Sequence, residues 1–328
     1  MKAIQIKAIG GPENLYVGTA PKPTYSNYEV LVKIHATALN RADTLQRKGM
    51  YPTPKGASPI LGLEMAGEIV AMGKGVTQWN IGDKVCALLA GGGYAEFINV
   101  HENMLIPIPQ DFSMEEATAI PEVFLTAFQA LKWIANLQPE DSLLIHAGAS
   151  GVGTAAIQLA KAMGCIDIIV TASAGKHVTC LNLGATLAID YKTQNFETVI
   201  KEHTNGKGVN VIIDFLAASY FQQNLNSLSV DGRMVMLALM GGIKADVNLV
   251  PVLMKRLKIQ GSTLRARTLD YKVVLTKDFT NFALPLFNNG TLKPVIDSVY
   301  NWKDVSKAHA YMEANKNIGK IVLRVSNR

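Results

Sequence analysis

The feature that most constrains the fold is a long alternation of apolar strand-like runs and helical segments between Pro121 and Ser262. Each run is short and almost continuously apolar, as expected for a strand buried on both faces. Strands separated by helices run parallel in one sheet. The alternation therefore predicts an α/β fold with a doubly wound domain and a six-stranded parallel sheet. The six runs are SLLIHA, IDIIVTA, ATLAID, VNVIIDFL, GRMVMLAL and LKIQGST.

The flanking segments have a different pattern. Residues 1–120 contain short alternating apolar stretches separated by turn compositions such as GGPEN and AGGG, which is typical of a compact antiparallel β domain. Residues 263–328 contain two helical patterns and a final strand, GKIVLRV. We expect a β domain at 1–120, a dinucleotide-binding domain at 121–262, and a tail at 263–328 that returns to the first domain.

Composition excludes several classes of protein. The 328 residues carry a formal charge of +6, but lysine and arginine are scattered, so a nucleic-acid partner is not favoured. We find neither a secretion signal nor an apolar run long enough to span a bilayer. The three cysteines, Cys86, Cys165 and Cys180, are far apart and read as reduced thiols. These features predict a cytoplasmic protein without a membrane partner.

A glycine-rich turn follows the first of the six apolar runs, in HAGASGVGTAAIQLAKAMG. Small residues between a strand and a helix let a pyrophosphate approach the backbone, and the free N–H groups at the helix start bind it. The motif is imperfect, since a serine stands where a second glycine is usual, but its context is that of a dinucleotide site. We expect the site to use Gly148, Ser150, Gly151, Val152 and Gly153.

The end of the second apolar run predicts which dinucleotide binds. A coenzyme with a free ribose 2′-hydroxyl requires a carboxylate there, whereas this sequence offers Ser173 and Lys176. The nearby acid, Asp167, begins the run instead of ending it. A hydroxyl and an ammonium suit a 2′-phosphate, and Tyr191 can add a second hydroxyl. These residues favour NADPH over NADH.

Several stretches together resemble the quinone-oxidoreductase branch of the medium-chain dehydrogenase/reductases. The resemblance covers nearly the whole chain, with its motifs in the order of that family. It implies a chaperonin-10-like β domain, an inserted Rossmann domain and a returning tail, in agreement with the pattern of strands and helices. The stretches are LNRADTLQRKGMYPTPKGASPILGLEMAGEIV, GDKVCALLAGGGYAEF, ATAIPEVFLTAFQAL, HAGASGVGTAAIQLAKAMG and AYMEANKNIGKIVL.

The resemblance also bears on metal binding. Zinc enzymes of this superfamily carry a cysteine and a histidine where this chain has Asn40 and Leu63, while Glu64 matches an acid that the family retains. Zinc requires three or four nitrogen, sulfur or oxygen ligands in close array. We therefore expect no bound metal, and we interpret Glu64 as structural.

The same resemblance suggests residues for substrate and coenzyme. Asn40, Asp43 and Tyr51 match positions that line the acceptor site, where a phenol can donate to a carbonyl oxygen or stack on a ring. Tyr51 as an ordinary loop tyrosine is the alternative.

Four further residues match positions near the coenzyme in that family. They are Thr126, Gly241, Gly242 and Arg265. A helical threonine bonded within its own turn is the alternative interpretation of Thr126.

The resulting hypothesis is an NADPH-dependent quinone oxidoreductase that works without zinc, by transfer of hydride or of single electrons. One alternative is an enone or alkenal double-bond reductase of the same branch. Another is a non-catalytic NADPH-binding protein with a structural or RNA-binding role. The resemblance further implies a homodimer and a small quinone or conjugated carbonyl compound as the acceptor. The histidines show no hydrolase-like context, and we interpret His146 as structural.

Overall fold

The computed structural model describes residues 1–325, which divide into two compact units. Unit 1 combines Met1–Leu125 with the carboxyl-terminal residues from Leu264 onward, and unit 2 is Thr126–Thr263. Helix α3 (Pro121–Phe128) begins in unit 1 and ends in unit 2. Unit 2 is thus one continuous segment, whereas unit 1 is assembled from two separate segments of the chain.

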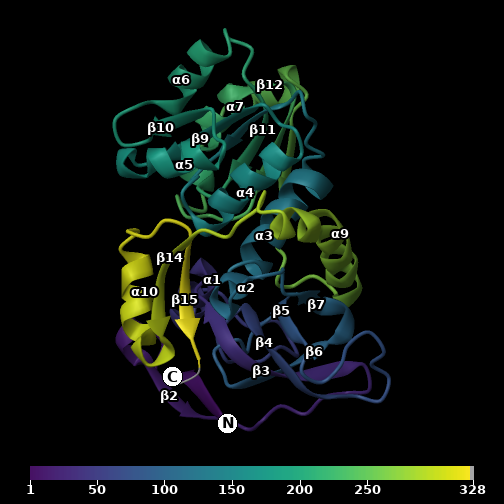
Figure 1. Ribbon diagram of the computed structural model, residues 1–328. Coiled ribbons are helices and arrows are strands. Elements are labelled where there is room, and N and C mark those ends of the chain that lie inside the picture. The colour runs from purple at the N-terminus through teal and green to yellow at the C-terminus, as the bar shows by residue number, and fades with distance from the viewer. Residues whose placement is uncertain (326–328) are drawn as a thin grey trace. The chain divides into compact units, whose positions relative to one another are not determined.

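Unit 2 contains a six-stranded parallel sheet in the order β10-β9-β8-β11-β12-β13 (Figure 1). The first strand, β8, lies in the middle of the sheet. Strands β9 and β10 follow it on one side, and β11, β12 and β13 follow on the other. Because crossovers between parallel strands are right-handed, the helices cover both faces of the sheet. The strands are β8 (Ser142–Ile145), β9 (Asp167–Ala172), β10 (Leu187–Asp190), β11 (Val209–Asp214), β12 (Leu228–Met236) and β13 (Lys258–Gly261).

The helices of unit 2 pack in pairs, with α4 against α5 and α6 against α7. Apolar side chains of the central strands and of α6 form a buried cluster that includes Leu144, Ile169, Ile200 and Ile212. Burial of this apolar area is the chief stabilising contribution of the unit. The helices are α4 (Gly151–Ala162), α5 (His177–Leu183), α6 (Phe196–His203), α7 (Phe221–Ser227) and α8 (Val250–Met254).

Unit 1 is built on a seven-stranded sheet in the order β14-β15-β3-β4-β5-β7, with β6 pairing β3. The carboxyl-terminal strand β15 pairs antiparallel with β3, so residues from both ends of the chain share this sheet. A separate hairpin joins β1 to β2. The strands are β1 (Lys2–Ile6), β2 (Leu15–Thr19), β3 (Glu29–Ala38), β4 (Glu64–Met72), β5 (Lys84–Leu88), β6 (Phe97–His101), β7 (Leu105–Pro107), β14 (Ile296–Asn301) and β15 (Lys320–Arg324). The helices are α1 (Arg41–Arg47), α2 (Met114–Thr118), α9 (Leu269–Asn288) and α10 (Val305–Glu313).

The predicted fold class is confirmed, with the six apolar runs forming the six parallel strands. Ser113 caps α2 by accepting from the backbone N–H of Glu116, whose carboxylate accepts from the N–H of Ser113. Helix α1 and strands β2, β7 and β14 are absent from the sequence prediction.

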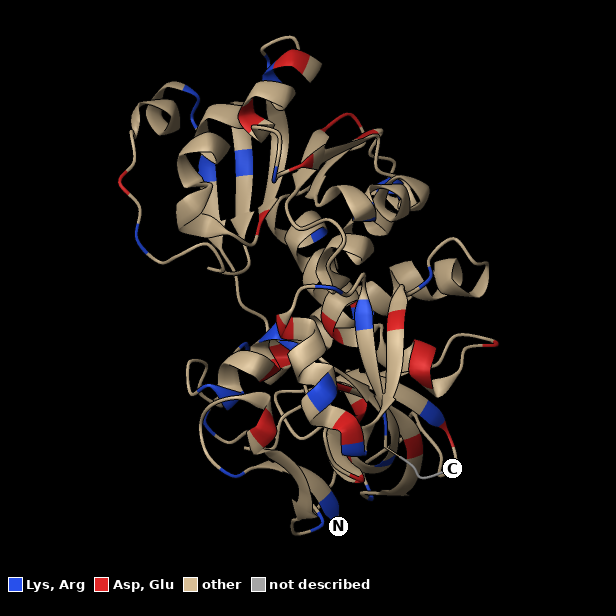
Figure 2. Cartoon of the chain, turned by 90° about the vertical axis from the view of Figure 1, so that its left-hand side faces the viewer, with Lys and Arg blue, Asp and Glu red and all other residues tan. Residues whose placement is uncertain are grey.

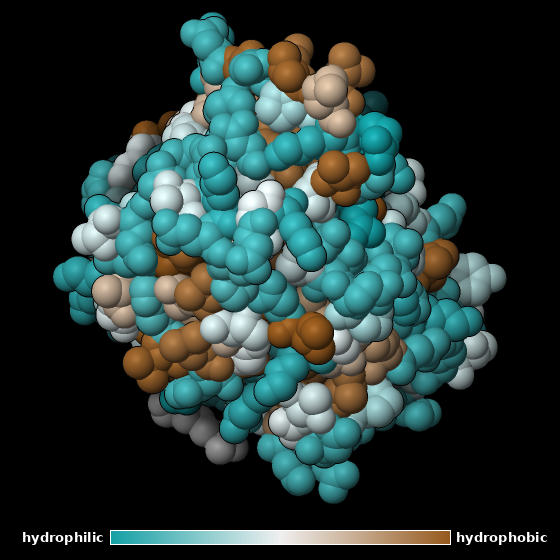
Figure 3. Space-filling view, turned by 90° about the horizontal axis from the view of Figure 1, so that it is seen from above, coloured by the Kyte–Doolittle hydropathy of each residue, from teal (hydrophilic) through white to brown (hydrophobic). Residues whose placement is uncertain are grey.

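Surface charge is mixed in sign. Basic and acidic residues are interspersed over the elements of both units (Figure 2). Exposed apolar side chains form small separate groups among hydrophilic ones on the face shown in Figure 3. Within residues 1–325 no helix combines the length and the apolar character needed to cross a membrane.

Candidate functional site

The glycine turn of unit 2 joins β8 to α4. A Cβ atom on Gly148 would lie 2.6 Å from the Cβ of Val170 in β9, and one on Gly153 would lie 2.6 Å from the carbonyl oxygen of Gly148. Ala147 adopts a left-handed φ of 50°, which is unusual for a residue with a side chain. The turn is therefore tightly folded, with Gly153 placed so that the helix start can lie against the strand end.

The first turn of α4 is arranged to bind an anion. Ser150 caps the helix by accepting a 3.0 Å bond from the N–H of Gly153. The N–H groups of Gly151 and Val152 precede the intrahelical bonds, so they remain at the positive end of the helix dipole. This geometry fits the pyrophosphate of a dinucleotide, with a serine in place of the second glycine of the usual motif.

Ser173 and Lys176 lie just beyond the carboxyl end of β9. Ser173 precedes the short 3-10 helix Ala174–Lys176 and makes no capping bond with its side chain. Tyr191 follows β10 and is 47% exposed. These three residues follow the ends of neighbouring strands, because β9 pairs with β10 in parallel. The residues present there suit a phosphorylated ribose.

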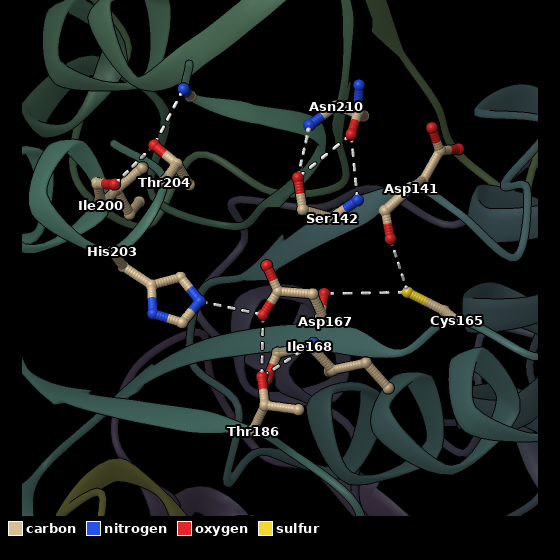
Figure 4. Close-up of polar contacts among 11 residues, drawn as sticks. Asp141, Ser142, Cys165, Asp167, Ile168, Thr186, Ile200, His203, Thr204 and Asn210 are labelled. Carbon is tan, nitrogen blue, oxygen red and sulfur yellow. Dashed lines mark hydrogen bonds and ion pairs between the residues drawn. The ribbon is translucent and has the colours of Figure 1, made fainter. Parts of the chain in front are cut away.

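Two carboxylates near these strands are already engaged. Asp167 begins β9 and therefore lies at the amino-terminal ends of the parallel strands, away from Ser173. There it accepts a hydrogen bond from the Thr186 hydroxyl and pairs with His203, both at 3.0 Å (Figure 4). Asp190 ends β10, but its oxygens accept from the N–H of Lys192 and the hydroxyl of Thr193 in its own turn.

The structure brings Gly241 and Gly242 against the turn that follows β11. The N–H of Gly241 donates to the carbonyl oxygen of Leu216 at 2.7 Å, and a Cβ on Gly241 would lie 2.7 Å from that oxygen. Buried Asp214 holds the same turn by accepting from the N–H groups of Leu216 and Ala217. Asp214 was not among the predicted site residues, although an acid at the end of an apolar strand was a signal from which it could have been found.

His146 lies at the end of β8 and is fully buried. Its ring nitrogens contact the Asn224 side-chain oxygen at 2.7 Å and the Thr171 hydroxyl at 3.0 Å. Burial lowers the pKa of His146, which favours the neutral ring. Thr126 is partly buried on α3.

In unit 1, Asn40, Glu64 and Lys320 form a buried polar cluster. The Lys320 ammonium donates to Asn40 Oδ1 and pairs with Glu64 Oε1, each at 2.7 Å. Asn40 Nδ2 donates to the same Glu64 oxygen at 2.8 Å. The other oxygen of Glu64 accepts from the N–H of Glu122. Asn40 thus uses its amide within the cluster, and the cation beside Glu64 is a lysine of this chain.

Asp43 is fully buried at the start of α1. Its carboxylate accepts from the N–H of Asn40 at 2.8 Å and from the N–H of Gly62 at 3.0 Å. Burial is the largest influence on this group and raises the pKa of Asp43 to about 6. The Tyr94 hydroxyl lies 3.4 Å from Asp43 Oδ2 and 3.3 Å from His309 Nε2.

The Tyr94 contact continues through His309 to Arg47. Arg47 lies 3.2 Å from Nδ1 of His309. Since arginine can only donate, Nδ1 accepts and Nε2 carries the hydrogen that faces Tyr94. Burial, followed by the charge of Arg47, lowers the pKa of His309 to about 3, so the ring is neutral. This network holds α1 against α10 and fixes the position of Asp43.

Arg265 lies beside Tyr51 in the same unit. The guanidinium donates through Nε to the carbonyl oxygen of Ala90 at 2.8 Å and through Nη2 to Gln46 Oε1 at 2.7 Å. Its central carbon lies 5.2 Å from the centre of the Tyr51 ring. Burial is the main reason that the pKa of Tyr51 is raised. We call Gln46, Tyr51, Ala90 and Arg265 the Arg265 cluster.

Glu122 is an acidic residue whose charge acts on Arg265 of that cluster. It is partly buried at the start of α3. Burial and then the charge of Glu64 raise the pKa of Glu122 to about 8, while Lys320 and Arg265 oppose this shift. A carboxyl group with this pKa is mostly protonated at neutral pH. The sequence carried no signal for this shift, because its cause is the folded surroundings.

The described part of the chain contains no group of three or more His, Cys, Asp or Glu side chains placed to hold a metal ion. The three cysteines are free and buried.

Two family models match the chain. The model for an alcohol dehydrogenase GroES-like domain matches residues 26–110, and that for a zinc-binding dehydrogenase matches residues 151–282. The chain is 31% identical to human synaptic vesicle membrane protein VAT-1 homolog, covering 98% of this chain and 86% of the relative. It is also 31% identical to the quinone oxidoreductase of Rattus norvegicus, covering 98% and 97% respectively.

Solved structures share the whole fold. An NAD-dependent alcohol dehydrogenase superposes with a TM-score of 0.89 at 31% identity, covering 99% of this chain and 100% of the other. CurK enoyl reductase gives 0.88 at 29%, covering 99% of each chain. A mycobacterial protein complexed with NADPH gives 0.86 at 29%, covering 99% and 100%. With matches over both units, the chain belongs to the medium-chain dehydrogenase/reductase superfamily and is an oxidoreductase of that family.

Proposed function

We propose that this chain reduces quinones with NADPH and that the Lys320 ammonium takes the place of a metal ion beside Glu64. The observation that carries the proposal is the Lys320 ammonium bonded to both Asn40 and Glu64. Acceptors that are already electron-poor need no Lewis acid to stabilise an alkoxide, and quinones are such acceptors. The 31% identity to a quinone oxidoreductase over nearly the whole of both chains supports this choice.

In this proposal the coenzyme is held by unit 2. The first turn of α4, from Ser150 to Gly153, binds the pyrophosphate through backbone N–H groups. Ser173, Lys176 and Tyr191 bind the 2′-phosphate, which accounts for the preference for NADPH. Thr126, Gly241 and Gly242 contact the nicotinamide half. When bound, the reduced nicotinamide would supply a hydride, which carries one proton and two electrons.

Unit 1 then supplies the acceptor side. Tyr51 contacts the acceptor ring, and the clusters around Asn40 and Asp43 keep the surrounding backbone in place. The functional division we propose is a catalytic domain at 1–120, an NADPH domain at 121–262 and a tail at 263–328 that completes the first. The three reduced cysteines fit a cytoplasmic location.

A second candidate function is reduction of a carbon–carbon double bond conjugated to a carbonyl. The similarity to an enoyl reductase over 99% of both chains favours it. Both reactions need the same coenzyme and an oxygen-binding acceptor site. An RNA-binding role is less favoured because basic and acidic residues are mixed over both units (Figure 2).

The test compares turnover of NADPH and NADH with an ortho-quinone and with an unsaturated ketone. We expect NADPH to be preferred and the quinone to be the faster acceptor. A preference for NADH, or turnover of the ketone alone, would contradict the proposal.

The variant Ser173→Asp sharpens this test. A carboxylate there repels a 2′-phosphate and accepts from a 2′-hydroxyl, so the NADPH/NADH ratio of kcat/KM should fall on the order of 100-fold. The control is Asn205→Asp, which adds the same charge in the exposed turn after α6. It should leave the ratio within twofold of the parent value.

A further inference from the structure

Arg265 is held rigidly although it lies in an irregular segment. Its side chain belongs to a residue that is only 5% exposed, and two of its nitrogens donate to Ala90 and Gln46. One partner lies beyond the end of β5 and the other on α1. A guanidinium fixed at two points has a defined direction for its remaining donors.

The third nitrogen of Arg265, Nη1, is buried and has no hydrogen-bond partner within residues 1–325. Nor does any carboxylate in this part of the chain lie within ion-pair distance of the guanidinium. Asp43 and Glu122 act on it only as more distant charges. A buried charged donor without a hydrogen-bond partner lowers the stability of the folded protein. Its presence here is explained if a ligand accepts a hydrogen bond from it.

Tyr51 provides a second donor at the same place. Its ring centre lies 5.2 Å from the central carbon of the guanidinium, and its hydroxyl makes no hydrogen bond to the described residues. A guanidinium nitrogen and a phenol hydroxyl that both lack a hydrogen-bond partner within the protein can together bind one oxygen atom with negative charge. The site lies wholly within unit 1.

We propose that Arg265 binds the carbonyl oxygen of the acceptor through Nη1, with Tyr51 as the second donor, and thereby selects acceptors whose oxygen becomes anionic on reduction. This inference rests on the proposed function and deepens it. It places Arg265 at the acceptor instead of at a coenzyme phosphate. The substrate class is a quinone or another conjugated carbonyl compound.

The charge balance explains why a cation is useful there. The acceptor gains a hydride, that is one proton and two electrons, from the reduced nicotinamide, and its π bonds shift so that the carbonyl oxygen becomes an oxyanion. Solvent then supplies a proton to that oxygen, giving the hydroxyl group of the product. Arg265 therefore interacts more strongly with the oxyanion than with the neutral carbonyl, which lowers the barrier.

A nitrophenol serves as a probe, because its phenolate resembles the reduced oxygen and its absorption reports its ionisation without any turnover. The wild-type protein should bind the phenolate and lower the pKa of the bound probe. Arg265→Gln should weaken phenolate binding at least tenfold and abolish that pKa shift. In the assay with quinone, kcat should fall on the order of 100-fold, with a smaller change in KM.

The matched control is Arg267→Gln, which removes the neighbouring arginine, whose guanidinium lies over Tyr271. It should leave probe binding and turnover within twofold of the wild type. If Arg265→Gln does not fold, probe binding and kcat are measured with Arg265→Lys instead. Lysine keeps the charge but lacks the planar fork, so it should still weaken both probe binding and kcat.

The inference is overturned if a folded Arg265 variant binds the phenolate and reduces quinones like the wild type. A different result would contradict the proposed quinone reduction without contradicting the role of Arg265. If the wild-type protein binds the phenolate through Arg265 but reduces no quinone, the oxygen site stands and the quinone reaction does not.

Discussion

At the scale of single residues, unit 1 gathers ionisable groups whose charge states are set by burial. Asp43 has a raised pKa because it is fully buried, and His309 has a lowered one for the same reason. Burial disfavours the charged form of each group, which is the anion of Asp43 and the cation of His309. The two pKa values therefore move in opposite directions. Glu64, which is also buried, accepts hydrogen bonds from an ammonium, an amide and a backbone N–H.

Glu122 gives a prediction at this scale. Its pKa is about 8 in the folded chain against an ordinary value of 4.5, so the folded state binds the extra proton between these values. Stability therefore falls as pH rises from about 4.5 to about 8. Glu122→Gln should remove that loss and raise the free energy of unfolding at pH 8.5 by about 1–3 kcal/mol, since partial exposure reduces the effect.

Urea unfolding at pH 5 and at pH 8.5 measures this difference. The control is Glu140→Gln, at an exposed carboxyl group, which should behave alike at both pH values. An equal effect of Glu122→Gln at the two pH values would show that the proton is not bound there.

At the scale of elements, the turn between β8 and α4 shows how backbone geometry limits sequence. Gly153 lies inside a helix, where alanine is normally preferred by about 1 kcal/mol. Here a side chain would meet the backbone of the preceding turn. The gain in helix propensity is therefore smaller than the cost of moving that backbone.

Gly153→Ala should accordingly lower the free energy of unfolding by about 1–3 kcal/mol and weaken NADPH binding at least tenfold. Gly175→Ala is the control for stability, because a Cβ at Gly175 meets no atom within 4 Å. It should change stability by less than about 0.5 kcal/mol. Denaturant titration and binding followed by nicotinamide fluorescence measure the two effects. A stable Gly153→Ala protein with full affinity would contradict this account of the turn.

The elements also show what sequence can predict. The parallel sheet was predictable because most of its strands contain a continuous apolar run and helical patterns separate them. Helix α1 was not, because RADTLQR has no apolar stripe and depends on the Asn40 cap and on the buried Arg47 side chain. Strand β14 is only partly buried and forms by pairing with β15.

The candidate site likewise has features that the sequence could predict and features that it could not. The glycine turn could be predicted because its residues are adjacent in the sequence. The partners of Arg265 could not, since they lie 175 and 219 positions away. Likewise the shifted pKa of Glu122 arises from charges on β4 and β15, which meet only in the folded chain.

At the scale of the whole molecule, β13 forms an open edge of the unit 2 sheet. Open edges tend to pair with another strand unless they are protected. The neighbouring helix α8 carries exposed apolar side chains, among them Val250, Leu253 and Met254. These features favour the proposed homodimer, with two copies pairing through β13.

We expect the mass in solution, measured by light scattering, to be twice the chain mass of 35.5 kDa. Leu253→Lys places a charge in the proposed interface and should shift the protein toward the monomer. Ile166→Lys is the control, because Ile166 is 77% exposed and Leu253 is 79% exposed, but Ile166 lies away from β13 and α8. A monomeric wild-type protein at micromolar concentration would contradict the dimer.

The assembly of unit 1 from two separate segments has a consequence for how the protein is made. Residues of unit 2 leave the ribosome as one uninterrupted stretch, and domains generally fold as units during synthesis. Strand β3 can pair early with β4 and β6, but its pairing with β15 forms only after the whole of unit 2 has been translated. Until Lys320 emerges, Asn40 and Glu64 lack their cation, so the nascent chain carries a complete unit 2 and an incomplete unit 1.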